Sequence, residues 1–383
     1  MPAPRKKLKT RLVKDVPALP DASTMDKLSE YELEHIFKWL SFSDKGRAAQ
    51  VCRRWKSTIY QVALWRNDKA LIKETAEMEI MAPSLVKRGI TEVCISGGKK
   101  AKKGKCNTPS KFLDQQLCHV TKIMAASLTC LDFCVERPVG FIVLQRVISM
   151  PMPNLKSLCL GKTFEVRNET LTNICDNCRN LSKLVISDCK NIDDKGMILF
   201  RHLRKLESLT MEHSQHVTDM DIAWLSFFAS ELIELCISYS GITDMGVAYF
   251  TKLRNLRSLD LTGCHRITSN CINILSNANS AVRDLKVTLC ADIAMEKIGR
   301  STLSISSLTV GRNNCCAASD SGINGLLNGR KPIRRLEILG RSVISVNGMT
   351  KLVNQLKDLE WLWINAENKI DYARREAELA RNN

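Results

Sequence analysis

The sequence lacks long hydrophobic runs. Its 383 residues contain no stretch approaching the roughly 18 uncharged apolar residues that a membrane span requires. The basic start, MPAPRKKLKTRLVKDV, is not followed by the apolar segment of a secretion signal. We therefore expect no membrane contact, a location in the cytoplasm and/or nucleus, and sixteen cysteines that stay reduced instead of forming disulfides.

Signatures of catalysis are also missing. The six histidines are scattered, and no phosphate loop, serine elbow or paired metal motif occurs. His213 and His216 could suggest a metal, but two isolated histidines on a turn are more often solvated. Cys175 and Cys178 have the C-x-x-C spacing of a metal or redox site without a second ligand pair, so structural thiols are the favoured interpretation. We expect no catalytic residue, no metal and no cofactor.

Two segments of the chain have few acidic residues and many basic ones, and together they contribute much of the net charge of +17. Residues 1–24 carry six basic and two acidic side chains, and residues 97–111, GGKKAKKGKCNTPSK, carry six lysines and no acid. The first resembles a disordered tail. The second could be an import signal, a set of ubiquitin acceptors or only a solvated insertion. The rest of the chain has no continuous basic stripe, so nucleic-acid binding is unlikely.

A repeated hexapeptide is the strongest feature that is present. From Leu155 onward the segments LKSLCL, LSKLVI, LESLTM, LIELCI, LRSLDL, VRDLKV, ISSLTV, IRRLEI and LEWLWI begin 23 to 28 residues apart, which is a leucine-rich repeat period. LTCLDF at 128 and ITEVCI at 90 extend the series to eleven strands if the lysine-rich segment is an insertion. Each strand is followed by apolar residues at helical spacing. Stacking of such units predicts an α/β fold, a curved solenoid with one short parallel strand and one helix per repeat.

A separate helical module precedes the repeats. In LSEYELEHIFKWL, residues 28–40, Ser29 and Glu32 form a capping box, and an apolar stripe follows at helical spacing. A second helix is expected to begin near Asp44 and to carry Trp55 on its apolar side, and a third to run from Ile59 to Trp65. Three short helices bury little surface alone, so we expect this module to lean on a partner or on the solenoid.

The stretch from Leu28 to Leu71 resembles an F-box, with a leading leucine, the HIFKWL helix, an aspartate at the second helix, and then AAQVCRRWKS and LWR. With the repeats, nearly the whole chain is similar to the F-box/leucine-rich-repeat family. The segments SDKGRAAQVCRRW and APSLVKRGITEV are similar to its partner-of-paired subfamily. Ser29 stands where that family usually has proline. The expected domains are a basic tail (1–24), a three-helix F-box (25–71), a linker with a first repeat-like unit (72–127), leucine-rich repeats (128–364) and a C-terminal cap (365–383).

The resemblance implies a non-catalytic substrate-recognition subunit of a Skp–cullin–F-box ubiquitin ligase. Its F-box would bind the Skp adaptor, and through it the cullin, while the repeats hold a protein substrate for ubiquitination and proteasomal degradation. The subfamily likeness hints at a transcription factor as substrate. The alternative is a leucine-rich-repeat scaffold or nucleic-acid-associated protein whose F-box-like helices recruit nothing. The residues expected to contact the adaptor are Leu28, Ile36, Phe37, Leu40, Val51 and Trp55.

The concave face of the solenoid is the expected substrate surface. Positions 3, 5 and 7 of each repeat face it, and they include three basic and five acidic side chains, which suits a basic protein segment. Trp361 and Trp363 could anchor a partner or could pack under the terminal segment as a cap. The substrate-binding candidates are Glu234, Asp260, Asp284, Arg335, Glu337, Trp361 and Trp363.

Overall fold

The computed structural model describes residues 27–65, 68–73, 78–96, 111–134, 141–161, 166–187, 189, 191–278, 280–311 and 317–364. The chain divides into two compact units, Met1–Arg66 and Asn67–Asn383. The expected basic tail, the expected C-terminal cap and all but the last residue of the lysine-rich insertion lie outside the described residues.

The first unit is helical. It contains α2 (Glu30–Lys38), α3 (Phe42–Ala48), α4 (Arg53–Ile59) and the short 3-10 helix η1 (Val62–Leu64). The predicted capping box at α2 is confirmed: the Glu32 backbone N–H donates to Ser29 Oγ over 3.3 Å, and the Ser29 N–H donates to Glu32 Oε2 over 2.6 Å. Together these bonds satisfy backbone donors that the first turn would otherwise leave free.

The second and third helices differ from the prediction. Helix α3 ends at Ala48, and Trp55 lies on α4, so the expected single helix through both was wrong. The cause is Cys52, whose backbone is extended and whose Sγ accepts a hydrogen bond from the Trp55 N–H over 3.4 Å, so that Cys52 caps a new helix. The expected third helix is therefore replaced by α4 and η1.

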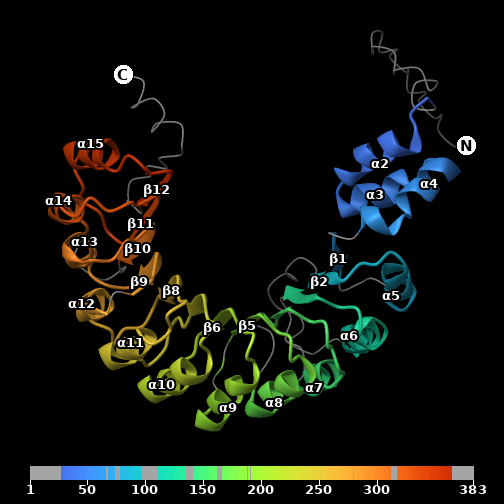
Figure 1. The fold of residues 1–383 in the computed structure, drawn as a ribbon, viewed down its shortest axis with the longest axis horizontal. Helices are drawn as coiled ribbons and strands as arrows, with labels where there is room; N and C mark the ends of the chain where they lie inside the picture. Colours follow the sequence, from blue (N-terminus) through green and yellow to red (C-terminus); the bar gives the residue numbers. More distant parts are fainter. Residues whose placement is uncertain are drawn as a thin grey trace, which may run out of the picture. The chain divides into compact units, whose positions relative to one another are not determined.

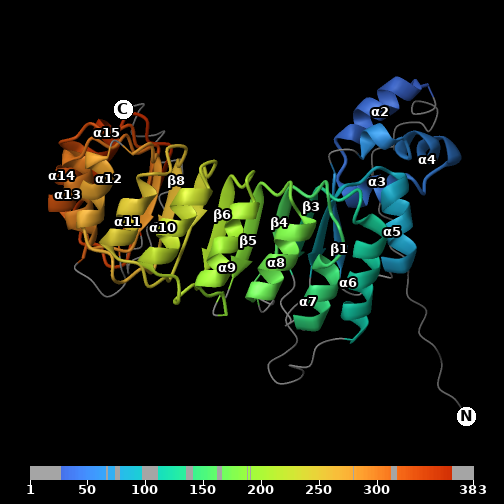
Figure 2. The same cartoon turned by 60° about the horizontal axis from the view of Figure 1, so that its bottom comes forward.

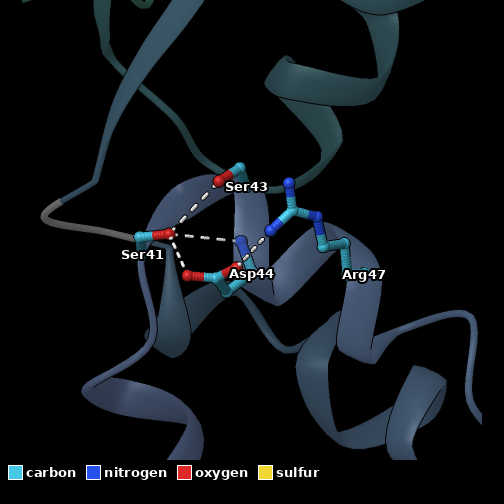
Figure 3. Close-up of polar contacts among 4 residues, drawn as sticks. All are labelled: Ser41, Ser43, Asp44 and Arg47. Carbon is cyan, nitrogen blue, oxygen red and sulfur yellow. Dashed lines mark hydrogen bonds and ion pairs between the residues drawn. The ribbon is translucent and has the colours of Figure 1, made fainter.

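Helix α3 begins two residues before the expected aspartate, because Ser41 is its N-cap. Figure 3 shows the polar contacts at this end of the helix. Ser41 Oγ accepts from the Asp44 N–H over 3.2 Å and donates to Asp44 Oδ2 over 2.6 Å, and Arg47 Nη1 donates to Asp44 Oδ1 over 2.9 Å. Asp44 thus closes the first turn and does not start it.

In the described residues of the second unit, twelve parallel strands pair in sequence order to form one sheet, and the repeat predicted this arrangement for eleven of them. Figure 1 shows the strands on the inner side of the curved repeat unit and the helices on its outer side, and Figure 2 shows the helices stacked side by side in sequence order. Within the described part of the chain, no helix is both long and apolar enough to cross a bilayer.

The strands are β1 (Lys69–Lys73), β2 (Glu92–Ser96), β3 (Cys130–Cys134), β4 (Ser157–Cys159), β5 (Lys183–Ser187), β6 (Ser208–Glu212), β7 (Glu234–Cys236), β8 (Ser258–Leu261), β9 (Asp284–Val287), β10 (Ser307–Gly311), β11 (Arg335–Leu339) and β12 (Trp361–Ile364). The helices are α5 (Met78–Lys87), α6 (Lys111–Met124), α7 (Phe141–Ile148), α8 (Asn168–Asn177), α9 (Asp194–Ile198), the 3-10 helix η2 (Leu199–His202), α10 (Asp219–Phe228), α11 (Asp244–Phe250), α12 (Asn270–Asn277), α13 (Ala291–Arg300), α14 (Asp320–Leu327) and α15 (Val346–Gln355).

The strand register explains the leucine period. Leu209, Leu235 and Leu259 pair across β6, β7 and β8, and none is more than 2% exposed, so each repeat contributes one leucine to a continuous buried row. Strand β1 was not predicted, because Ala70 occupies the leucine position of KALIK and pairs with Val93 of β2. This strand begins inside the range expected for the F-box, whereas the first compact unit ends at Arg66.

Candidate functional site

The first unit leaves large apolar side chains exposed. On α2, Tyr31 is 77% exposed and Ile36 42%, and Trp39 at the C-cap of this helix is 79% exposed. Val51, Tyr60 and Val62, between α3 and η1, are exposed as well. A concentration of aromatic and aliphatic side chains on so small a unit is typical of a protein-binding surface.

The predicted adaptor contacts fall into two groups. Ile36 and Val51 are exposed, and Leu28, Leu40 and Trp55 are partly exposed, so all five can touch a partner. Phe37 is different, because it is 1% exposed and its ring packs edge-on against Trp55 with 5.1 Å between centroids. Phe37 therefore joins α2 to α4 in the interior and offers no surface.

Sequence reasoning overlooked Trp39 and Tyr31. Trp39 lies three residues after Ile36, so the two side chains share one side of α2. The apolar stripe was assigned as a single set, whereas the structure splits it into a buried pair, Leu33 and Phe37, and an exposed set around Ile36. The available signal was the number of apolar residues on α2, which exceeds what one buried face can hold.

Two basic side chains of the first unit connect its helices. Lys45 is 1% exposed, donates from Nζ to the Leu64 carbonyl over 2.6 Å and lies 5.6 Å from the centroid of the Trp65 ring. Arg54 donates to the Leu28 carbonyl at the start of α2. These contacts hold the helices of the unit together.

The concave face brings four substrate candidates together at its C-terminal end. In the strand register Arg335 of β11 pairs with Trp361 of β12, and Glu337 pairs with Trp363. Trp361 is 42% exposed, and Trp363 and Glu337 are half-buried. Glu337 accepts a hydrogen bond from Thr309 Oγ1 over 3.0 Å, which orients its carboxylate on the strand face.

The three acidic candidates lie on consecutive strands, β7, β8 and β9. Asp260 pairs with Lys286 over 3.4 Å, so part of its charge is neutralised within the sheet. Polar neighbours fix the other two carboxylates: Ser208 Oγ donates to Glu234 over 2.9 Å, and Ser306 Oγ donates to Asp284 over 3.1 Å. The middle of the face is therefore an acidic area of oriented carboxylates.

A ring stack at the ends of β6 and β7 was not foreseen. The His213 and Tyr239 rings stack with 4.8 Å between centroids and 17° between planes, and both residues have a φ of 56°. Gly263 follows at the equivalent position, where a Cβ would stand 2.5 Å from the Tyr239 ring. His213 is therefore half-buried in a stack, in contrast to its expected solvation, while His216 is exposed as expected.

The C-x-x-C pair is buried. Burial raises the pKa of both Cys175 and Cys178 to about 12, and Cys175 Sγ donates to the Leu199 carbonyl over 3.3 Å. Thiols with such pKa values stay protonated at neutral pH when no metal is bound. Among the residues that the structure describes, no group of three or more histidine, cysteine, aspartate and glutamate side chains is placed to hold a metal ion. The interpretation of Cys175 and Cys178 as structural thiols stays a prediction.

Comparisons with known proteins match both parts of the chain. A family described as F-box-like matches residues 33–68, and a family described as Leucine Rich repeat matches residues 177–200 and 252–270. Among solved structures, the chain is similar to one titled "Crystal structure of Rad7 and Elc1 complex in yeast", with 15% identity, a TM-score of 0.42, and coverage of 89% of this chain and 82% of that chain. The likeness to the partner-of-paired subfamily stays a prediction.

Proposed function

Because the chain combines an F-box-like domain with leucine-rich repeats, we propose that it is the substrate-recognition subunit of a Skp–cullin–F-box ubiquitin ligase. Its helical unit binds the Skp adaptor, which links it to the cullin. Its repeats bind a protein substrate for ubiquitination and degradation, in the cytoplasm or nucleus. The chain itself is non-catalytic, and the transfer of ubiquitin takes place on other subunits.

The observation that carries the proposal is the exposed apolar surface of the F-box-like unit. Tyr31 and Ile36 of α2 and Trp39 at its C-cap have exposed side chains, whereas Leu33 and Phe37 of the same helix are buried. Leaving such side chains in water forgoes about 1.5–3 kcal/mol for each one that a partner could bury. An adaptor that covers this surface recovers that free energy.

The concave face supports a protein as the ligand of the repeats. The acidic area of Glu234, Asp260 and Asp284 favours the approach of a basic segment, and the tryptophans of β12 offer large apolar contacts next to Arg335. Ser307 and Thr309 of β10, which have small side chains, separate these features. A basic segment with apolar anchors, such as a transcription factor could supply, fits this face.

The test is co-purification of the full chain with a Skp adaptor and a cullin. We expect all three to elute together, and we expect Ile36→Asp to abolish the association because a charge replaces an apolar contact. The matched control is Ile142→Asp, since Ile142 is also exposed, at 67%, but lies on α7 of the repeats. If folded wild-type chain captures no adaptor, the chain is a leucine-rich-repeat scaffold instead and the proposal is wrong.

A further inference from the structure

A second exposed apolar surface lies on the outer helices of the repeats. On α10, Met220 is 57% exposed, Trp224 40% and Phe227 77%, whereas Ile222 and Leu225 on the opposite side of the same helix are buried. The exposed positions are spaced by four and three residues, so they form a stripe along the helix. A contiguous exposed apolar stripe of this kind is a candidate contact surface for a partner.

The aromatic side chains of the stripe hold one another in place. The Trp224 and Phe228 rings stack with 6.2 Å between centroids and 6° between planes. Phe227 packs edge-on against Phe228 at 5.1 Å. Side chains that are already ordered lose little conformational freedom on binding, which favours their use as contact residues.

The neighbouring helix α11 continues the apolar surface. Thr218 and Thr243 cap α10 and α11, so Met245 is equivalent to Met220, and Tyr249 to Trp224. Met245 is 66% exposed, and α11 lies beside α10 on the outer side of the repeat unit (Figure 1). We call this surface the α10–α11 patch, which consists of Met220, Trp224, Phe227, Phe228, Met245 and Tyr249.

Basic side chains flank the patch on both sides. Ser208, Glu234 and Ser258 pair across β6, β7 and β8. Residues that lie the same number of positions before these three in the sequence therefore occupy equivalent positions in neighbouring repeats. By this register Lys252 is equivalent to Phe228, and Ser230 lies between Arg204 and Arg254; all three basic residues are exposed. Lys252 Nζ also lies 5.1 Å from the centroid of the Tyr249 ring, which keeps a positive charge at the edge of the patch.

We propose that the α10–α11 patch binds an acidic amphipathic segment of a partner protein, independently of the substrate face. Aromatic side chains supply the apolar contacts, and methionines adapt to the shape of the partner. The flanking arginines and lysine supply charge complementarity for carboxylates. A second copy of the chain is a poor occupant, because the net charge of +17 makes two copies repel each other.

The proposal is tested with the full chain and a synthetic peptide. The probe is a fluorescently labelled amphipathic helix of about 18 residues, with leucines along one face and glutamates on the other. We expect the anisotropy of the probe to rise on binding, and the affinity to fall at high salt. A peptide with lysines in place of the glutamates, and one with serines in place of the leucines, should bind at least about tenfold more weakly.

Two kinds of variant connect the binding to the patch. Phe227→Ser removes the most exposed ring, and the pair Arg204→Glu and Arg254→Glu reverses the flanking charge; each should weaken binding by about tenfold or more. The control is Ile293→Ser on α13, which is 46% exposed and should bind the probe as wild type does. Unchanged far-ultraviolet circular dichroism and melting temperature would show that the variants are folded.

Several results would overturn the proposal. These are no binding of the acidic probe to the wild-type chain, equal binding to all variants, or a preference for the lysine peptide. Tight binding of a single-stranded oligonucleotide that is lost in Phe227→Ser would assign the patch to nucleic acid instead. A dimer in solution that dissociates in Phe227→Ser would assign it to self-association. None of these results depends on whether the F-box-like unit binds a Skp adaptor.

Discussion

Asp219 and Thr243 link the starts of two neighbouring helices in the repeats. The Asp219 carboxylate accepts hydrogen bonds from the Thr243 N–H over 2.8 Å and from Thr243 Oγ1 over 2.6 Å. It also accepts from the Gly246 N–H over 3.0 Å. The same link joins Asp244 to Thr268, Asp292 to Ser319, and Asp320 to Ser345. At these four positions one repeat therefore caps the helix of the next, which couples their stabilities.

The first prediction concerns the glycine beneath this link. A Cβ at Gly246 would stand 2.6 Å from Asp219 Oδ1, so Gly246→Ala should displace the carboxylate and cost about 1–3 kcal/mol. Gly46 on α3 is the control, because a Cβ there meets nothing within 4 Å, and Gly46→Ala should stabilise its helix by about 0.5–1 kcal/mol. Denaturant unfolding of both variants measures the two effects. Wild-type stability in Gly246→Ala would mean that the link carries no free energy.

The second prediction concerns the pH dependence of stability. Burial raises the pKa of Asp221, which is 3% exposed and has one carboxylate oxygen without a hydrogen-bond partner. Because this folded pKa lies above the unfolded one, the native state favours the protonated form, and stability is lost as the pH rises through the folded pKa. We expect Asp221→Asn to raise the melting temperature at pH 7, and the gain to vanish as the pH falls toward 3.8, the unperturbed value.

Asp320 should show the opposite sign. Hydrogen bonds from the side chain and backbone of Ser345 lower its pKa, so its stabilising effect is present above the unfolded pKa and is lost on acidification. Asp320→Asn should therefore lower the melting temperature at pH 7, and the loss should shrink as the pH falls below 3.8, its unperturbed value. Melting curves between pH 3 and 7 for both variants test the two signs, and the same sign for both would contradict the assignments.

The third prediction concerns the C-x-x-C pair. With pKa values raised to about 12 by burial, Cys175 and Cys178 should not react with a maleimide at pH 7 in the native protein, while the exposed Cys52 reacts readily. Mass spectrometry of labelled peptides gives the extent of reaction at each site. Bound zinc that is lost in Cys175→Ser would instead support a metal site.

The fourth prediction concerns the two tryptophans of β12. We expect the double change Trp361→Ala and Trp363→Ala to weaken the binding of basic, aromatic-rich peptides on an array, and to leave the melting temperature and adaptor binding unchanged. The capping alternative forecasts a lower melting temperature and faster proteolysis of residues 365–383. If proteolysis becomes faster while the folded protein binds peptides normally, the tryptophans are not substrate anchors.

The repeat architecture could be predicted from the sequence because every unit needs a buried residue at the same position. The leucine period therefore predicted the strand at Leu235 and its pairing with Leu259 in the neighbouring strand. Strand β1 was missed because Ala70 fills that position with too small a side chain to be recognised. A strand that is recognised by a single buried residue is therefore missed when that residue is replaced by a smaller one.

The surface residues were harder to predict, because an apolar residue of a helix can lie on its buried side or on its exposed side. Phe37 on α2 and Trp39 at its C-cap are two residues apart, yet one is 1% and the other 79% exposed. Phe37 is buried because its ring packs against Trp55 of α4, and the spacing of residues in the sequence does not reveal this contact. The stack of His213 on Tyr239 was also hidden, since it requires positive φ at two residues that rarely adopt it.

The central claim is that the exposed side of α2 binds a Skp adaptor, and the most direct measurement is the affinity of purified full chain for purified adaptor by calorimetry. We predict that Trp39→Ala weakens binding by at least about tenfold with an unchanged melting temperature, and that Ile142→Ala on α7 has no effect. Binding of Trp39→Ala and of Ile36→Asp at wild-type affinity would contradict the account.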